Sequence, residues 1–310
     1  MELRTLKYYL SLAERGSFTA AARDHYVTQP AISIQLKKLQ NELGTKLFEI
    51  DRREIRFTES GRVVLDYARR FVELEKEFFR EMNDLEGLKR GKLLIGTIDA
   101  ASIYVLPKVF SRFRENYPGI EVDLEISSTL PLLRALEKGK LDLVVGTLPV
   151  TDRDRFEVFP VYSEKLIPIA SPDHPLASEE EVSSARFAEY PFICFQRESV
   201  TRAMIEELFR KKKIGLKITM AIDSQEAIRN LVISGLGLSI LPEWTVRDQI
   251  RSGSLKSLKV RGLTMRRDIG LIIPSGRYLP STARAFLGVL KDEMGVDLPS
   301  RLIITEGESR

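Results

Sequence analysis

The 310-residue sequence has one cysteine, Cys194, and two histidines, His25 and His174. A lone cysteine cannot form a disulfide within the chain, which fits a reducing compartment. Cys194 lies in the apolar segment 192–195 and is interpreted as a core residue, and neither histidine has a catalytic or metal-ligating partner near it in sequence. Walker A loops, Gly-x-Ser-x-Gly elbows and His/Cys metal spacings are absent from the sequence. We therefore expect no cofactor, no metal and no enzymatic activity.

Long apolar runs and a strong charge imbalance are also missing. No run is long enough to span a bilayer, and residues 1–4 do not begin a signal peptide, so a cytoplasmic protein is expected. Lys and Arg outnumber Asp and Glu only 48 to 44, and a net charge of +4 does not by itself indicate nucleic-acid binding. Any such function must depend on where the basic residues lie. The length suggests two or three domains, and 43% hydrophobic residues suffice for their cores.

Residues 17–62 have the pattern of two short helices at a sharp angle followed by a basic hairpin. Ser17 and Thr28 can cap the two helices, and Pro30 lies in the first turn of the second, where a missing N–H costs nothing. Apolar residues at helical spacing predict that one face of the second helix is buried: Ala31, Ile32, Leu36 and Leu39. This is the pattern of a winged helix-turn-helix, which places its second helix in the major groove.

The polar and basic side chains of residues 17–62 can contact the base edges and phosphates of DNA. Ordinary solvation of these polar side chains is the alternative, and their joint placement favours DNA contact. The candidate DNA-binding residues are Ser17, Thr19, Thr28, Gln29, Pro30, Ser33, Gln35, Lys38, Arg52, Arg53 and Arg56.

A helix of about thirty residues, roughly 45 Å long, is expected between Thr58 and Gly87. It could lie on its own domain, but a narrow apolar stripe on so long a helix favours pairing with a partner helix. The predicted stripe comprises Val64, Ala68, Phe71, Phe78, Met82 and Leu85, widened by Tyr67 and Leu74.

Beyond a hinge at 87–91, strands and helices alternate, which predicts a largely parallel sheet. The expected strands are 92–97, 121–126, 141–146, 156–160, 165–170, 192–195, 217–221, 239–241 and 268–273. The expected helices are 106–116, 131–138, 201–212, 224–234 and 281–292.

Two sets of residues give the chain a resemblance to LysR-type transcriptional regulators. In the first part these are Leu3, Phe18 and segments 20–22, 29–33, 36–39, 42–44, 46–48 and 57–61. In the second part they are Gly96, Phe113, Gly139, Ser199 and segments 106–107, 117–119, 141–142, 174–176, 201–202, 235–237 and 241–243. The sequence departs from the family at Ile34, where an arginine is frequent, and at Ala100, where many relatives have Ser or Thr.

The resemblance implies an α/β protein with an all-α winged helix-turn-helix, a long linker helix and a two-lobed α/β effector domain of the periplasmic-binding-protein fold. The implied divisions are a DNA-binding domain at 1–58, a dimerisation helix and hinge at 59–90, and an effector-binding domain at 91–300. Lobe I would comprise 91–161 and 268–300, and lobe II 162–267. A polar, frayed tail is expected at 301–310.

Ligands of open α/β sheets lie beyond the carboxyl ends of strands, and hydroxyls before helix N-termini suit an anion. N-capping is the alternative role for the same Ser and Thr residues. Arg202 could pair with a carboxylate or point to solvent, and Asp223 with Ser224 is interpreted mainly as a helix cap. The candidate effector-binding residues are Asp99, Ala100, Ser102, Ser128, Thr129, Gly146, Thr147, Phe195, Gln196, Ser199, Thr201, Arg202 and Asp223.

The leading interpretation is a DNA-binding transcriptional regulator modulated by a small-molecule effector. The implied partners are operator DNA, the effector, RNA polymerase and further copies of the chain in a homodimer or homotetramer, but no membrane. A solute-binding protein would not explain residues 1–62, and an enzyme on the same two-lobed fold would lack catalytic residues.

Overall fold

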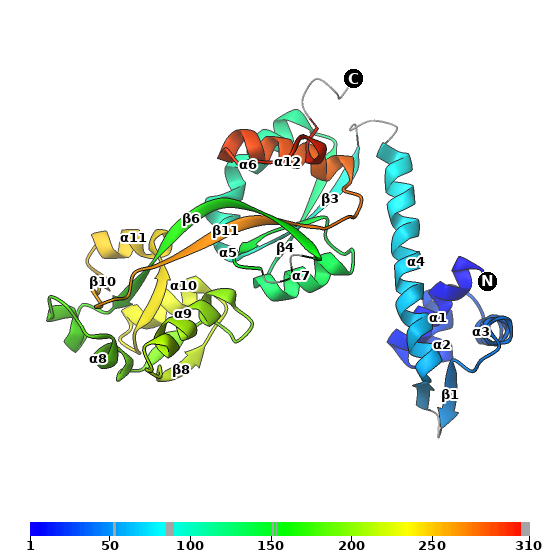
Figure 1. Ribbon diagram of the computed structural model, residues 1–310, viewed down its shortest axis with the longest axis horizontal. Coiled ribbons are helices and arrows are strands. Elements are labelled where there is room, and N and C mark those ends of the chain that lie inside the picture. The colour runs from blue at the N-terminus through cyan, green and yellow to red at the C-terminus, as the bar shows by residue number, and fades with distance from the viewer. Residues whose placement is uncertain (52–53, 85–89, 151, 153, 305–310) are drawn as a thin grey trace. The chain divides into compact units, whose positions relative to one another are not determined.

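The computed structural model describes residues 1–51, 54–84, 90–150, 152 and 154–304 (Figure 1). The chain divides into two compact units, Met1–Leu85 and Glu86–Arg310, which we call the N-terminal and C-terminal units. The predictions for Arg52, Arg53, Leu85, residues 87–89 of the hinge and residues 305–310 lie outside the described residues.

The helices of the N-terminal unit begin and end at residues suited to those positions. Ser17 Oγ accepts a hydrogen bond from Ala20 N at 3.4 Å and so caps the helix that begins at Phe18, as predicted. The predicted Thr28 side-chain cap is wrong. Pro30 has no N–H to donate, and Ala31 N bonds the Thr28 carbonyl oxygen instead. The elements are α1 (Leu3–Arg15), α2 (Phe18–Asp24), α3 (Gln29–Leu43), β1 (Phe48–Asp51), β2 (Glu54–Phe57) and α4 (Glu59–Asp84).

Tyr9 joins the hairpin and α4 to the helical core of this unit. Its buried hydroxyl lies 3.3 Å from Leu47 O and 3.2 Å from Gly61 O, and it can donate to either. Burial raises the pKa of Tyr9, which keeps the phenol protonated as a donor. A Cβ at position 61 would lie 1.9 Å from Leu47 O, so glycine is required for this close approach.

Helix α4 has two apolar faces rather than one. Leu65 and Ala68 are buried in the core of the N-terminal unit, with Val64 half-buried beside them. The predicted stripe is therefore wrong at Val64 and Ala68, because those positions face the helix's own domain. The rest of the predicted stripe is exposed, apart from Leu85, which lies outside the described residues, and Val63 joins it. We call this exposed set the outer stripe: Val63, Tyr67, Phe71, Leu74, Phe78 and Met82.

The first lobe of the C-terminal unit has a sheet in which β3 runs parallel to both β4 and β5. Helices cover both faces (Figure 1). Leu143 and Val145 face the core formed with α6 and α12, whereas Val144 faces α7, as strand alternation requires. The elements are β3 (Gly91–Thr97), α5 (Asp99–Tyr104), α6 (Leu106–Asn116), β4 (Ile120–Ile126), α7 (Thr129–Glu137), β5 (Leu143–Thr147) and α12 (Ser281–Met294).

Two long antiparallel strands, β6 (Phe156–Ala170) and β11 (Met265–Pro274), cross from the first lobe to the second (Figure 1). Two expectations were wrong here. Segments 156–160 and 165–170 form one strand, and that strand is antiparallel to its neighbour. Pro160 lies within this single strand, which accommodates it at a register shift opposite Ile269 and Gly270.

The second lobe pairs β7 with β8 in parallel and adds β9 to the edge of β6. Helices α8 and α11 were not predicted; α8 has five residues, and α11 directly follows a strand that ends in Pro242. The elements are η1 (Pro175–Ser178), α8 (Ser184–Ala188), β7 (Phe192–Cys194), α9 (Val200–Lys211), β8 (Ile218–Ala221), α10 (Gln225–Ile233), β9 (Ser239–Pro242), α11 (Glu243–Arg251) and β10 (Lys256–Ser257).

The chain near its C-terminus is ordered further than predicted. Ser300–Leu302 forms the 3₁₀ turn η2, and Leu302 and Ile303 are buried in the core of the first lobe. Ile304 N also donates to Arg284 O at 3.2 Å. The expectation of a frayed tail is therefore wrong for residues 301–304, because two apolar side chains and a backbone bond attach them to α12.

Leu36 and Ile34 lie two residues apart on α3 and provide a matched test of the N-terminal core. Leu36 is 0% exposed, whereas Ile34 is 66% exposed. We expect Leu36→Ala to lower the free energy of unfolding by about 2–5 kcal/mol and Ile34→Ala to change it by less than about 0.5 kcal/mol. Urea unfolding followed by circular dichroism measures both. Equal effects of the two substitutions would contradict the packing described.

Candidate functional site

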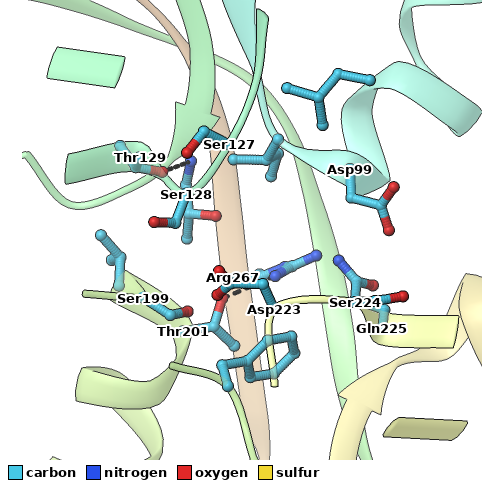
Figure 2. Close-up of a pocket in the computed structure, with 15 residues that line it drawn as sticks. Asp99, Ser127, Ser128, Thr129, Ser199, Thr201, Asp223, Ser224, Gln225 and Arg267 are labelled. Atoms are coloured by element: carbon cyan, nitrogen blue, oxygen red, sulfur yellow. Dashed lines mark hydrogen bonds between the residues drawn. The ribbon is translucent and has the colours of Figure 1, made fainter. Parts of the chain in front are cut away.

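A cavity of about 300 Å³ lies in the C-terminal unit, where the N-termini of α5, α7, α9 and α10 meet (Figure 2). The first two helices belong to the first lobe and the last two to the second. Each N-terminus carries a partial positive charge, so together they favour an anionic group between them. The lining residues are Ile98, Asp99, Ile126, Ser127, Ser128, Thr129, Thr147, Phe195, Ser199, Val200, Thr201, Asp223, Ser224, Gln225 and Arg267.

The first lobe contributes hydroxyls beside the ends of β4 and β5. Thr129 Oγ1 accepts a hydrogen bond from Thr147 N at 2.9 Å, which fixes the start of α7 against β5. Ser128 occupies the N-cap position of α7 but makes no side-chain capping bond. Ser128 is therefore better placed than Thr129 to offer its hydroxyl to a ligand.

The second lobe contributes the caps of α9 and α10. Ser199 Oγ accepts from Arg202 N at 3.4 Å, and Ser224 Oγ accepts from Ala227 N at 3.2 Å. The expected cap of α10 is thus Ser224, while Asp223 lines the cavity.

Arg267 enters the cavity from the crossover strand β11. Its Nε bonds Glu164 Oε1, on the facing strand β6, and its Nη1 donates to Thr201 Oγ1 at 2.7 Å. Both members of this ion pair are buried. In Figure 2 the guanidinium lies centrally, with Thr201 bonded to it.

Arg267 and Gln225 were missed by the sequence analysis. A signal for Arg267 was available, because Met265, Arg267 and Ile269 alternate toward one buried face. The expected strand began at residue 268, so the charge was excluded from that pattern. Gln225 follows the cap of α10, and no sequence pattern distinguishes it from a solvent-exposed first-turn residue.

Five predicted effector residues are not brought to the cavity lining. Arg202 bonds Glu206 Oε1 at 2.8 Å and Phe195 O at 3.1 Å, so it points neither to a ligand nor to open solvent. Ser102 Oγ donates to Asp99 O at 2.7 Å, and Gln196 Nε2 donates to Ala221 O at 2.8 Å. The other two are Ala100, which is buried in the first-lobe core, and Gly146, which lies within β5 against Thr129.

Asp99 is the first residue of α5 and is half-buried in the cavity wall. Burial raises the pKa of this carboxyl, and the nearby charge of Glu226 raises it further. An ionised Asp99 is therefore held in surroundings that disfavour its charge, and a hydrogen-bond donor on a ligand would relieve this.

Cys194 and His174 have structural positions. Cys194 is buried in the second-lobe core, and burial raises its pKa to about 11, so its thiol stays protonated near neutral pH. His174 Nδ1 accepts from Leu176 N at 3.1 Å and caps the η1 turn. Within the part of the chain that the structure describes, no cluster of three or more His, Cys, Asp or Glu could hold a metal, and no helix has the length and apolarity of a membrane span.

The N-terminal unit presents the candidate DNA surface on α3. Gln29, Pro30 and Lys38 are exposed, and Ser33 is half-buried. Gln35 borders the buried face, where its Oε1 lies 3.5 Å from Thr5 Oγ1, so it is less available than predicted.

The remaining DNA candidates flank α3. Thr28 and Thr19 are exposed, whereas the Ser17 hydroxyl already caps α2. In the hairpin, Arg56 is exposed and forms an ion pair with Glu54, in which Nη2 lies 3.5 Å from Oε2.

Two family models match the chain, and between them they cover most of it. Residues 3–62 match "Bacterial regulatory helix-turn-helix protein, lysR family", and residues 86–295 match "LysR substrate binding domain". The HTH-type transcriptional activator CmpR of Synechocystis sp. is 32% identical, over 93% of this chain and 94% of its own. The RuBisCO operon transcriptional regulator of Allochromatium vinosum is also 32% identical, over 92% of this chain and 94% of its own.

Among solved structures, a mutant of OxyR from Corynebacterium glutamicum superimposes with a TM-score of 0.57 at 25% identity, over 95% of this chain and 92% of its own. The predicted fold class, a helix-turn-helix followed by an α/β effector domain, is confirmed.

Because the pKa of Asp99 is raised, we expect Asp99→Asn to increase the stability of the protein in a pH-dependent manner. Below the ordinary pKa of 3.8 the carboxyl is neutral in both folded and unfolded chains, so it carries no charge penalty. As the pH rises above 3.8, the unfolded chain ionises first, and the wild type loses stability relative to the variant. We expect the variant to have the higher midpoint at neutral pH and no advantage below about pH 4. Thermal unfolding across this range is the measurement; a constant difference at all pH values would contradict it.

Proposed function

Because the chain belongs to the LysR family of bacterial transcription regulators, we propose residue-level roles for its two units. The protein is a DNA-binding transcription regulator modulated by a small-molecule effector, and it is not an enzyme. Its relatives regulate transcription, which leaves the solute-binding alternative without support.

We place DNA recognition on the exposed residues of α3. Gln29 is suited to read a base edge, because its amide can donate and accept at once. Lys38 is suited to a phosphate. The supporting observation is that both side chains are exposed on α3, while Ile32, Leu36 and Leu39 fix this helix in the core of the N-terminal unit. Thr19, Thr28, Ser33 and Arg56 would add contacts around them.

We place the effector in the cavity between the two lobes. The observation that supports this is that Arg267 and the N-termini of α7, α9 and α10 line one cavity. At about 300 Å³ the cavity lies at the small end of the range for ligand pockets, roughly 300–1,000 Å³, which suits a small metabolite. Of the residues predicted from sequence, we retain Asp99, Ser128, Thr129, Thr147, Phe195, Ser199, Thr201 and Asp223.

We propose domain divisions at 1–58, 59–90 and 91–300, with the lobes meeting near 162 and 268. Separate hydrophobic cores on the two sides of these positions support the lobe boundaries. The outer stripe of α4 would bind the same stripe of a second copy, giving a homodimer and, through further contacts, a homotetramer. We also infer contact with RNA polymerase and action in the cytoplasm, where bacterial DNA lies.

Gln29→Ala tests the DNA interface. Loss of a base contact costs about 1–3 kcal/mol, so we expect roughly tenfold or greater weakening on duplexes selected from a random library by the wild type. Lys38→Ala should weaken binding to all sequences. It should also reduce the slope of log affinity against log salt concentration by about one, because one fewer phosphate is neutralised.

Fluorescence anisotropy at several salt concentrations measures both effects. Gln249→Ala, in the C-terminal unit, is the matched control and should bind DNA like the wild type. Unchanged affinity of both α3 variants, with folding intact, would overturn the assignment.

Leu74→Lys tests the outer stripe. Leu74 is 60% exposed in the unpaired chain, so a charge there should leave the fold intact but oppose burial against a second α4. Light scattering should show a wild-type oligomer and a variant shifted toward monomer by at least tenfold in dissociation constant. The control is Leu236→Lys, at a position that is 46% exposed in the C-terminal unit. Dissociation by both variants, or by neither, would argue against pairing through α4.

A further inference from the structure

Two polar atoms of the cavity wall are buried and have no hydrogen-bond partner: Arg267 Nη2 and Gln225 Oε1. Arg267 is 2% exposed and Gln225 is 5% exposed. Buried polar groups almost always have partners, because an unpaired one loses its interaction with water without compensation. Two such atoms in the wall of one cavity indicate a ligand that supplies both partners.

Arg267 is held in one orientation before any ligand arrives. Its Nε is bonded to Glu164 and its Nη1 to Thr201, so rotation of the guanidinium would break existing bonds. A guanidinium only donates, and it is matched to carboxylate and phosphate oxygens. The remaining Nη2 therefore calls for a ligand oxygen that carries negative charge.

Gln225 offers a hydrogen-bond acceptor, whereas Arg267 offers a donor. Its unpartnered Oε1 is an acceptor, and it lines the cavity together with the carboxylate of Asp99. The charge of Glu226, the next residue of α10, acts on Asp99, so the start of α10 and the start of α5 present acceptors to the same region. Figure 2 shows Asp99 and Gln225 on the same side of Arg267 in this view.

The charges of the cavity argue against a simple anion. Glu164 already offsets Arg267, and the carboxylates of Asp99 and Asp223 line the cavity. A ligand with several negative charges and no donor would meet these carboxylates directly. A ligand that also carries a hydroxyl or ammonium group would satisfy them.

We infer that the effector is a small hydroxy- or amino-substituted acid, whose carboxylate or phosphate is bound by Arg267 and whose hydroxyl or ammonium group donates to Gln225 and Asp99. This inference rests on the proposed effector function of the cavity. Arg267 and Glu164 face one another across β11 and β6, so the anionic group binds at the strands that join the lobes.

The test compares ligands that differ only by the donor. Glycolate is paired with acetate, L-alanine with propionate, and glycerol phosphate with methyl phosphate, so the carboxylate and phosphate alternatives are separated. Each is titrated into the full-length protein by calorimetry. In at least one pair we expect the donor-bearing member to bind at least tenfold more tightly.

Variants assign that preference to the two residues. Gln225→Met should remove most of the difference within the pair, and Arg267→Lys should weaken both members at least tenfold. The matched controls are Gln196→Met, which lies outside the cavity, and Arg266→Lys, whose side chain is exposed and bonds Ser163. Without ligand, Gln225→Met should not lower the melting temperature, because its oxygen has no partner to lose. This second measurement does not depend on the choice of probe.

The outcomes separate the inference from the function on which it rests. If a probe binds in an Arg267-dependent manner but the members of every pair bind equally, the effector cleft stands and the donor requirement is wrong. If Gln225→Met keeps the preference, the donor is recognised elsewhere and the inferred role of Gln225 is wrong. If Gln225→Met lowers the melting temperature of the free protein, an ordered water or structural bond occupies the oxygen and the inference fails. If no probe binds the wild type, both are overturned.

Discussion

The arrangement of the C-terminal unit depends on the ion pair between Glu164 and Arg267. It is buried on the two strands that join the lobes, where each charge has lost nearly all of its hydration. Such a pair contributes little net stability, because desolvation offsets most of the attraction. Any other register of the two strands would nevertheless be costly, because it would leave a buried charge without its partner. A slip of one residue in β11 would turn Arg267 outward, bring Arg266 inward and leave Glu164 buried without its partner. The pair therefore specifies the register of the crossover.

The same pair gives the cavity its electrostatic character. Thr201, at the start of α9, is bonded to Arg267, so the crossover strands, the second lobe and the cavity wall meet at one guanidinium. An effector that contacts Arg267 therefore contacts the strands about which the lobes would move. It can change the relation of the lobes only to the extent that it binds one arrangement more tightly than another. A site at the crossover is well placed for that, because small changes in strand geometry alter its contacts directly.

Local signals in the sequence predicted most of the regular structure. Helix 106–116 was predicted at its observed bounds, since Pro107 lies in its first turn and Pro118 follows it. The helix-turn-helix was predicted from capping residues and apolar spacing. The failures have two physical causes. Pro160 lies inside β6 because a register shift between the paired strands accommodates it. Thr28 does not cap α3 through its side chain, because Pro30 has no N–H and Ala31 N bonds the Thr28 carbonyl oxygen.

The candidate site was predicted less completely for a related reason. Helix N-termini and strand ends can be located from sequence, so Ser128, Thr129, Ser199 and Thr201 were found. The roles of Arg267 and Gln225 depend on atoms that remain unpaired after every neighbour has been placed, and that is a property of the whole fold.

In helix α4, too, the packing of the whole unit decides the role of residues that look alike in the sequence. Its sequence contains more apolar positions than one face can hold, and the structure resolves this by giving the helix two faces. The face with Leu65 and Ala68 is fixed by the core of the N-terminal unit, which leaves the outer stripe with its orientation set but without cover from that core. An apolar stripe held rigidly in this way loses little conformational entropy when it is covered. A residue substitution on the inner face would therefore act on assembly through the orientation of the helix, whereas one on the outer face would act on it directly.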